Sequence, residues 1–194
     1  MRGNGQTWGN EAVLSNIHED IDHILFTEEQ LTSRVKELGR QITEDYQGEP
    51  LVVVGILRGA VIFMSDLVRS MDLPLEMDFM MVSSYGDDVQ SSGRVRIVQD
   101  LSLNIRDKHV LIVEDVLDTG LTLHNLIERF NVLGPKSVSV VALMRKDTPG
   151  QLEVGCRYVG YECPNEFIVG YGLDYAQRYR NLPYIGVLKQ EVYA

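Results

Sequence analysis

The sequence has few cysteines and few basic residues, and each shortage excludes a class of protein. Only two of its 194 residues are cysteine. Cys156 and Cys163 are seven positions apart and have no histidine near them at zinc-site spacing, so we expect reduced thiols, neither a disulfide framework nor a metal site. Lys and Arg number 18 against 28 Asp and Glu, which gives a net charge of −10. Such an acidic chain is a poor general partner for nucleic acids or anionic membranes.

Long apolar runs and targeting signals are also missing. No stretch approaches the roughly 20 consecutive apolar residues of a membrane span, and the N-terminus lacks a basic-then-apolar signal, so a cytoplasmic location is expected. Residues 1–16 are polar and glycine-bearing without any period, which is typical of a flexible arm. A chain of 194 residues with 44% hydrophobic content predicts one domain over 1–194 with a full core.

The clearest functional pattern lies in residues 110–130. It begins with a short apolar run, Val110 to Val113, typical of a strand buried on both faces of a parallel sheet. It ends in a helix whose apolar face includes Leu123, Leu126 and Phe130. Between them stands EDVLDTGLT, an acidic pair followed by a turn of acidic, hydroxyl and glycine residues. Because a loop entering a helix presents unpaired N–H groups and the positive end of the helix dipole, this turn suits a phosphate.

Different side chains of this segment suit different parts of a ligand. Thr119 and Thr122 can donate hydroxyl hydrogen bonds, and Gly120 lets the backbone come close to a ligand. Glu114 and Asp115 suit ribose hydroxyls, which donate hydrogen bonds, or Mg²⁺, which prefers hard oxygen ligands. Phosphate, diol and metal together describe a phosphorylated sugar.

Other interpretations of this pattern compete. The acidic pair could be a solvated strand end, with the threonines as ordinary helix caps. A receiver domain closes its first strand with an acidic pair, but here over a hundred residues precede the pair. A P-loop ATPase needs GxxxxGK[ST], which does not occur in the sequence. The sugar-phosphate interpretation is therefore favoured.

The rest of the chain alternates strands and helices, which predicts an α/β fold, a mostly parallel sheet with helices on both faces. The turn Arg58-Gly59-Ala60 again joins a strand to a helix, so it is either a second anion site or a plain βα turn. Residues 83–93 form a polar loop of the kind found in lids or disordered segments. Helices are expected over 27–42, 61–69 and 123–130, and strands over 51–57, 76–82, 94–98, 110–113, 137–144, 158–162, 167–170 and 185–188.

Five segments, in order, resemble those of the 6-oxopurine branch of the type I phosphoribosyltransferases. They are GILRGA at 55–60, FMMVSSYG at 79–86, VLIVEDVLDTGLTL at 110–123, Lys146 at a strand end, and EFIVGYGLDYAQRYRNLPYIG at 166–186. The resemblance implies that family's fold, with a small hood formed by N- and C-terminal segments. Its members transfer 5-phosphoribosyl from phosphoribosyl pyrophosphate (PRPP) to N9 of a purine, with Mg²⁺, and release pyrophosphate. It implies hypoxanthine, and guanine with it, as the base, IMP or GMP as the product, and a homodimer or homotetramer with no nucleic-acid or membrane partner.

The resemblance also implies roles for the matching residues. Asp118 would be the general base facing N7 of the purine. The PRPP phosphate and ribose would be held by Glu114, Asp115, Asp118, Thr119, Gly120, Leu121 and Thr122. The purine would contact Lys146, Phe167, Ile168 and Asp174. Pyrophosphate would contact Arg180 and also Arg58 and Gly59, and the loop that carries these last two often has a non-proline cis peptide in the family. Mg²⁺ would be bound by Glu114, Asp115 and Asp174, and Ser84 and Tyr85 would lie on a lid over PRPP.

A second function of another class stays open. Pyrimidine-operon attenuation regulators share the fold and the PRPP motif but act mainly by binding mRNA. They need a basic surface, which a chain of net charge −10 does not obviously offer. Binding mRNA also does not explain why Lys146 is followed by a segment with Phe167 and Asp174. Strong retention on heparin or RNA at low salt would favour the regulator.

Overall fold

Six strands form the central sheet, and only one edge strand runs against the others. The computed structural model describes residues 16–84, 95–164 and 166–194. In spatial order the strands are β4 (Val95–Gln99), β3 (Glu76–Ser84), β2 (Leu51–Leu57), β5 (His109–Leu117), β6 (Ser137–Lys146) and β7 (Cys156–Cys163). The pair of β3 and β4 is antiparallel, and the other pairs are parallel. The predicted mostly parallel α/β sheet is confirmed.

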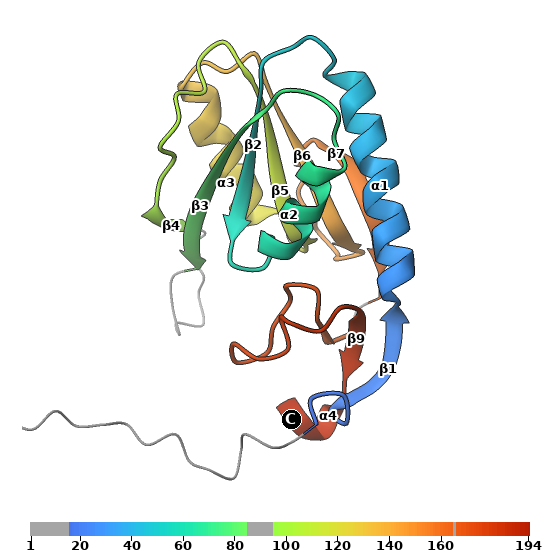
Figure 1. The fold of residues 1–194 in the computed structure, drawn as a ribbon. Coiled ribbons are helices and arrows are strands. Elements are labelled where there is room, and N and C mark those ends of the chain that lie inside the picture. The colour runs from blue at the N-terminus through green and yellow to red at the C-terminus, as the bar shows by residue number, and fades with distance from the viewer. Residues whose placement is uncertain (1–15, 85–94, 165) are drawn as a thin grey trace, which may run out of the picture.

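Helices cover both faces of this sheet. The helices α1 (Glu28–Asp45) and α2 (Val61–Arg69) pack on one face, and α3 (Leu121–Val132) lies behind the other (Figure 1). Side chains alternate across each strand, so Val53 and Leu111 belong to the core under α1 and α2, while Val52 and Ile112 belong to the core under α3. None of the helices in the described ranges is long and apolar enough to cross a membrane.

The helix α1 begins as its sequence predicts. Thr27 is the N-cap: its hydroxyl accepts the Gln30 N–H at 3.3 Å, and the Gln30 side chain accepts the Thr27 N–H at 2.8 Å. This reciprocal capping box satisfies two N–H groups that a helix start leaves unpaired. The helix runs three residues beyond the predicted end at Ile42 and stops at Asp45.

A second, smaller sheet forms the hood. It is antiparallel and has the order β1 (Ile21–Phe26), β9 (Ile185–Leu188), β8 (Ile168–Val169). A short helix, α4 (Gln190–Tyr193), follows β9. Figure 1 shows this sheet and the loop before β9 below the ends toward which the parallel strands point. The carboxyl ends of β2, β5 and β6 therefore face the hood.

Asp78 is a buried carboxylate that supports the sheet from within β3. Its side chain is only 6% exposed. It accepts the N–H groups of Phe79 at 2.8 Å, Ser102 at 2.7 Å and Leu103 at 2.8 Å. Burial alone raises the pKa of this carboxyl, but these donors outweigh burial and hold its pKa below the ordinary value of 3.8. Asp78 thus fixes the chain after β4 to the sheet.

Asp78→Asn is expected to destabilise the protein by about 2 kcal/mol at neutral pH, because charge-assisted hydrogen bonds are replaced by weaker ones and an amide N–H₂ is buried facing donors. A lowered folded-state pKa contributes stability that is present above the unfolded-state value and lost as the pH falls. The difference between wild type and variant should therefore shrink below about pH 3.8. Urea unfolding at neutral pH and below pH 3.8 measures the difference in stability, with the exposed Asp72→Asn as control. Equal stability of wild type and Asp78→Asn at neutral pH would contradict the prediction.

Candidate functional site

The candidate site lies at the carboxyl ends of β2, β5 and β6, where open α/β sheets bind ligands (Figure 1). Residues predicted from distant segments meet there around a cavity of about 290 Å³. Lys146 is the last residue of β6, Phe167 precedes β8, and Asp118 follows β5. The cavity is lined by Asp115, Val116, Asp118, Lys146, Phe167, Ile168, Leu173 and Asp174.

A smaller cavity of about 80 Å³ adjoins it at the start of α3. Gly120 is the N-cap of this helix and has a φ of 77°, a left-handed conformation that favours glycine. A Cβ on Gly120 would also lie 3.0 Å from the carbonyl oxygen of Leu152. The turn thus depends on glycine and brings the helix start to the cavity wall. The cavity is lined by Glu114, Val116, Leu117, Asp118, Thr119, Gly120, Thr122 and Leu123.

Glu114 and Asp115, predicted as a pair, lie on opposite faces of β5. Neighbouring residues of a strand point to opposite faces, and the strand continues to Leu117. Glu114 lines the small cavity beside α3, whereas Asp115 lines the large cavity and lies against Gly59. The two carboxylates therefore face different parts of any ligand that spans both cavities.

Both carboxylates are held in an environment that disfavours charge. Burial, and secondly the neighbouring Asp115, raises the pKa of Glu114 well above its usual value. Its Oε2 is buried and accepts no hydrogen bond from the part of the chain that the structure describes. Burial also raises the pKa of Asp115, although the Val116 N–H donates to its Oδ1 at 2.8 Å. Such acceptors fit a ligand that brings hydroxyl donors or a cation.

The carboxylates predicted to bind Mg²⁺ do not form a complete metal site by themselves. Among residues 16–84, 95–164 and 166–194, no group of three or more His, Cys, Asp or Glu could hold a metal ion. Glu114, Asp115 and Asp174 therefore do not form a ready set of ligands. Mg²⁺ commonly keeps several waters and binds one or two carboxylates together with substrate phosphates.

Asp118 lines both cavities and is oriented by residues that the sequence did not single out. The Thr148 hydroxyl donates to Asp118 Oδ1 at 2.6 Å. The Gln151 amide donates to the carbonyl oxygens of Asp118 and, at 3.0 Å, Lys146. Gln151 thus ties the end of β5 to the end of β6. Both residues stand in a loop without periodicity, so only the fold reveals their role.

Two arginines of the predicted pyrophosphate subsite share one acceptor. The Gln177 side-chain oxygen accepts from Arg58 Nη1 at 2.8 Å and from Arg180 Nη2 at 3.2 Å. Arg180 also pairs with Asp174, with Nη2 and Oδ1 2.6 Å apart. Gln177, another residue missed in the sequence, holds two like charges together without neutralising either. The remaining guanidinium N–H groups suit a polyanion.

The loop that carries Arg58 is tightly enclosed. The peptide bond between Leu57 and Arg58 is cis, a point that the sequence left open. A Cβ on Gly59 would overlap the Asp115 carboxylate, and a Cβ on Gly172 would overlap the carbonyl oxygen of Gly59. The loop thus fits between β5 and the hood only because both positions are glycine.

Some predicted residues, or their side chains, are not described by the structure. Ser84 is the last residue of β3, and its side chain is not among those described. Tyr85 lies outside the described residues, as does the predicted arm up to residue 15. The lid and the arm stay predictions.

Comparison with known proteins agrees with this geometry. Residues 24–176 match the family model of the phosphoribosyl transferase domain. The chain is 49% identical over 178 residues to a hypoxanthine-guanine phosphoribosyltransferase of Staphylococcus aureus, covering 92% of this chain and 99% of that one. It is 48% identical over 186 residues to a bifunctional protein TilS/HprT of Listeria monocytogenes, covering 96% of this chain but only 28% of that protein.

A solved structure is equally similar. The crystal structure of a hypoxanthine phosphoribosyltransferase from Staphylococcus aureus superposes with a TM-score of 0.88 at 48% identity, covering 94% of this chain and 99% of that one. The likeness extends over both sheets, so it includes the hood as well as the motif at the end of β5. The chain therefore belongs to the phosphoribosyltransferase family, in its hypoxanthine-guanine phosphoribosyltransferase branch.

Proposed function

We propose that the chain transfers the 5-phosphoribosyl group from PRPP to N9 of hypoxanthine, and of guanine, in purine salvage. The products are IMP or GMP and pyrophosphate. One observation carries the proposal: the cavity of about 290 Å³ has an acid, a lysine and an aromatic ring in its wall, and it shares Asp118 with the smaller cavity at the start of α3. A base and a sugar phosphate therefore meet at Asp118.

The walls of the large cavity suit a 6-oxopurine. Lys146 has only donors, so it matches a 6-oxo acceptor and repels the 6-amino group of adenine. Phe167 offers a flat face for stacking, and Ile168 offers backbone groups to the base edge. A site built on such a hydrogen bond discriminates strongly, since the wrong base leaves a buried charge unpaired.

Asp118 and the two arginines act on opposite ends of the reaction. Breaking the bond between C1 of the ribose and pyrophosphate builds positive charge on the sugar and negative charge on the leaving group. Arg58 and Arg180 stabilise the leaving group. Asp118 accepts the purine proton as N9 becomes nucleophilic. Asp115 and Asp174 would help to hold a Mg²⁺ ion brought with PRPP, and the ion would supply further positive charge for the leaving group.

The small cavity holds the other end of PRPP. The first turn of α3 and the hydroxyls of Thr119 and Thr122 receive the 5-phosphate. The ribose lies between the cavities, where its hydroxyls donate to Glu114 and Asp115. The unpaired Glu114 Oε2 gains the hydrogen bond that it lacks among the described residues.

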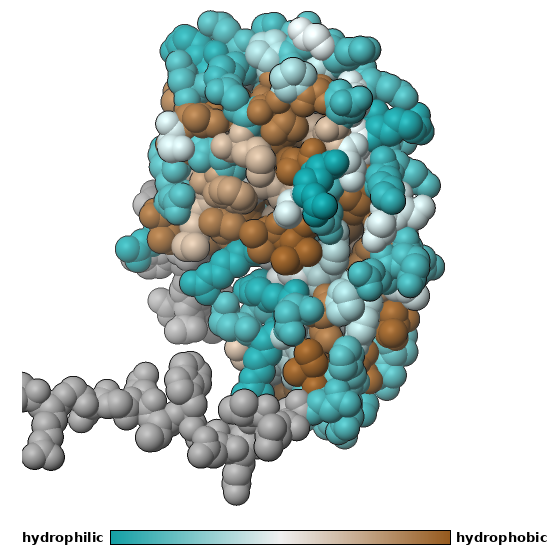
Figure 2. Space-filling view, in the orientation of Figure 1, coloured by the Kyte–Doolittle hydropathy of each residue, from teal (hydrophilic) through white to brown (hydrophobic). Residues whose placement is uncertain are grey.

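We further propose that the protein is cytoplasmic and self-associates as a homodimer or homotetramer. Figure 2 shows apolar side chains gathered on the face that carries α2 and β3. Val61 and Ile62 of α2 are each 38% exposed, and Met77 of β3 is 44% exposed. A contiguous apolar patch on a soluble protein is typical of an interface. Light scattering tests this against the monomer mass of 21.9 kDa, and a monomer at micromolar concentration would contradict it.

The function is tested by a spectrophotometric assay of the purified chain with PRPP and Mg²⁺, offering hypoxanthine, guanine, xanthine, adenine and uracil separately. We expect turnover of hypoxanthine and guanine, none with adenine, and loss of all turnover on adding EDTA. Activity on uracil alone, or on no base, would contradict the proposal and favour the RNA-binding regulator. Rapid turnover of adenine would contradict the role of Lys146.

A further inference from the structure

We propose that Tyr193 is a positioning residue that supports the Phe167 ring from behind and thereby fixes the aromatic wall of the base cavity. The proposal rests on the proposed function, in which Phe167 stacks on the purine. Tyr193 belongs to α4, an element that neither the periodicity nor the motifs of the sequence predicted. Its partner ring lies 26 residues earlier in the chain.

The rings of Phe167 and Tyr193 are stacked. Their centroids are 4.7 Å apart and their planes differ by 20°. Tyr175 closes the group edge-on, with its centroid 5.5 Å from Phe167 at 87° and 6.4 Å from Tyr193 at 67°. Offset stacking with one edge-to-face neighbour is the arrangement that aromatic quadrupoles favour. Three side chains thus restrict one another.

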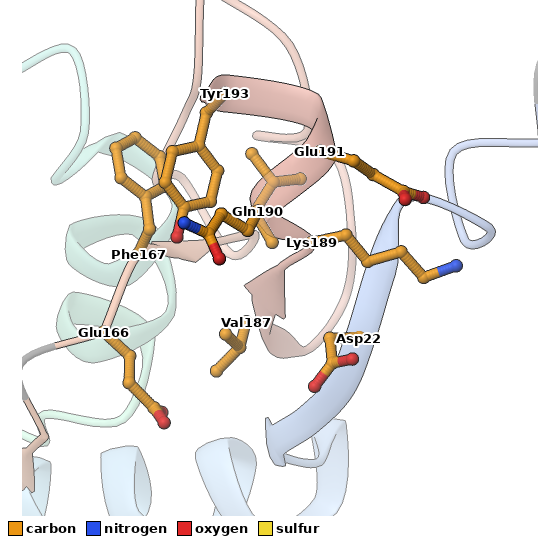
Figure 3. Close-up of a pocket in the computed structure, with 9 residues that line it drawn as sticks. Asp22, Glu166, Phe167, Val187, Lys189, Gln190, Glu191 and Tyr193 are labelled. Atoms are coloured by element: carbon orange, nitrogen blue, oxygen red, sulfur yellow. The ribbon is translucent and has the colours of Figure 1, made fainter.

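Phe167 lies between two cavities, so its stacking with Tyr193 affects the wall of the cavity proposed for the base. On one side it lines the base cavity of about 290 Å³ together with Asp118 and Lys146. On the other side it lines a cavity of about 710 Å³ beneath α4, which Tyr193 lines and which Figure 3 shows. Tyr193 does not line the base cavity. It therefore contacts Phe167 from the side away from Asp118 and Lys146.

The backbone holds α4 in the place that this contact requires. The Leu188 N–H donates to the Phe167 carbonyl oxygen at 2.8 Å, so β9 and the residue before β8 are joined directly. The Lys189 N–H donates to the Asp20 carbonyl oxygen at 3.0 Å, and Val192 packs on the core of the small sheet. The start of α4 is thus fixed on two strands of the hood. This places Tyr193 against Phe167, which is itself 37% exposed.

If the Phe167 ring is already held in place, less conformational entropy is lost when the base binds. Without Tyr193, Phe167 would have free space behind it and would populate further rotamers, so part of the binding free energy would be used to order the ring. The effect should fall on the binding of the base and leave PRPP untouched, because the small cavity and the arginines lie on other elements. The structure therefore predicts a selective change in KM.

The test compares Tyr193→Ala and Tyr193→Phe in steady-state assays that vary hypoxanthine and PRPP separately. We expect Tyr193→Ala to raise KM for hypoxanthine roughly 3- to 10-fold, the scale of one aromatic pair, while KM for PRPP and kcat change less than about two-fold. Tyr193→Phe keeps the ring and should restore the wild-type KM. Glu191→Gln is the matched control, since Glu191 lines the same cavity on the same helix without contacting the ring stack.

An unchanged KM for hypoxanthine in Tyr193→Ala would overturn the proposal. A lower KM would also overturn it, because Tyr193 would then compete with the base. If Tyr193→Ala does not fold, Tyr193→Leu fills part of the space behind Phe167 but cannot stack on its ring, and a smaller rise in KM for hypoxanthine is expected. Failure of the proposed function has a different signature: the wild-type protein itself would not turn over hypoxanthine. If the wild type is active and Phe167→Leu leaves KM for hypoxanthine unchanged, Phe167 does not stack on the base and the Tyr193 proposal is overturned with the function intact.

Discussion

Asp118→Asn is expected to bind PRPP and to lose most of its turnover. The substitution keeps the size and shape of the side chain but removes the carboxylate that we propose accepts the purine proton. The oxygen that replaces Oδ1 can still accept the Thr148 hydroxyl, now 2.6 Å from Asp118, so the side chain should keep its orientation. General-base catalysis typically contributes a factor of about 10² to 10⁴, and kcat should fall within that range.

The measurement pairs kcat with the binding of PRPP and Mg²⁺ by calorimetry. Asp147→Asn is the matched control, because Asp147 is an exposed carboxylate in the loop after β6 that lines neither cavity. It should turn over like the wild type. Near-normal turnover in Asp118→Asn would remove the general-base role. A variant that has lost PRPP binding would instead show that Asp118 holds the ribose phosphate and would leave proton transfer to another group.

The sequence predicted the strands and helices best where apolar residues are dense. The bounds of β2, α2 and β9 agree with the predicted 51–57, 61–69 and 185–188 residue for residue. The strand β2, for example, is an apolar run between Pro50 and Arg58, so the run itself determines the element. The helix α1 is similar, because Thr27 and Gln30 specify its first turn.

Elements that depend on partners were predicted less well. The strand β5 was expected to end at Val113, but it continues to Leu117 because pairing with β6 persists through Leu117 and Arg145. Polar side chains there hide the strand from a hydrophobicity pattern. The strand β1 has one buried residue, Ile21, and pairs with β9 through two irregularities, so it shows no alternation.

The site residues, like the strands and helices, fall into those that the sequence predicts and those that it does not. The motif residues are adjacent in sequence, so Asp118, Gly120 and the acidic pair could be named as candidates without a structure. Thr148 and Gln177 act through hydrogen bonds to residues 30 and 119 positions away. No local pattern signals such contacts, since a threonine or glutamine in a loop is ordinarily solvated. They emerge only once the strand ends are brought together.

Gly59→Ala is expected to lower kcat/KM for PRPP on the order of 100-fold, the cost that a misplacement of about 1 Å can have at a reacting centre. The φ of Gly59 is not among the left-handed values of the described glycines, so the backbone itself accepts alanine. The added Cβ would instead fall on Oδ2 of Asp115. The loop has no room to retreat, because Gly172 lies directly behind the Gly59 carbonyl. Asp115 or Arg58 must therefore move.

The contrast with Gly48→Ala separates this steric effect from ordinary strain. Gly48 has a φ of 78° and nothing within 4 Å of an added Cβ, so alanine there costs stability of about 1 kcal/mol without touching the site. Melting temperature should fall in Gly48→Ala, and kcat/KM should not. In an Asp115→Ala background, Gly59→Ala should cause little further loss, because the clash is gone and the two positions act as one unit. If the two losses simply add, or if Gly59→Ala alone is active, Gly59 is not required for the placement of Asp115 and the pyrophosphate loop.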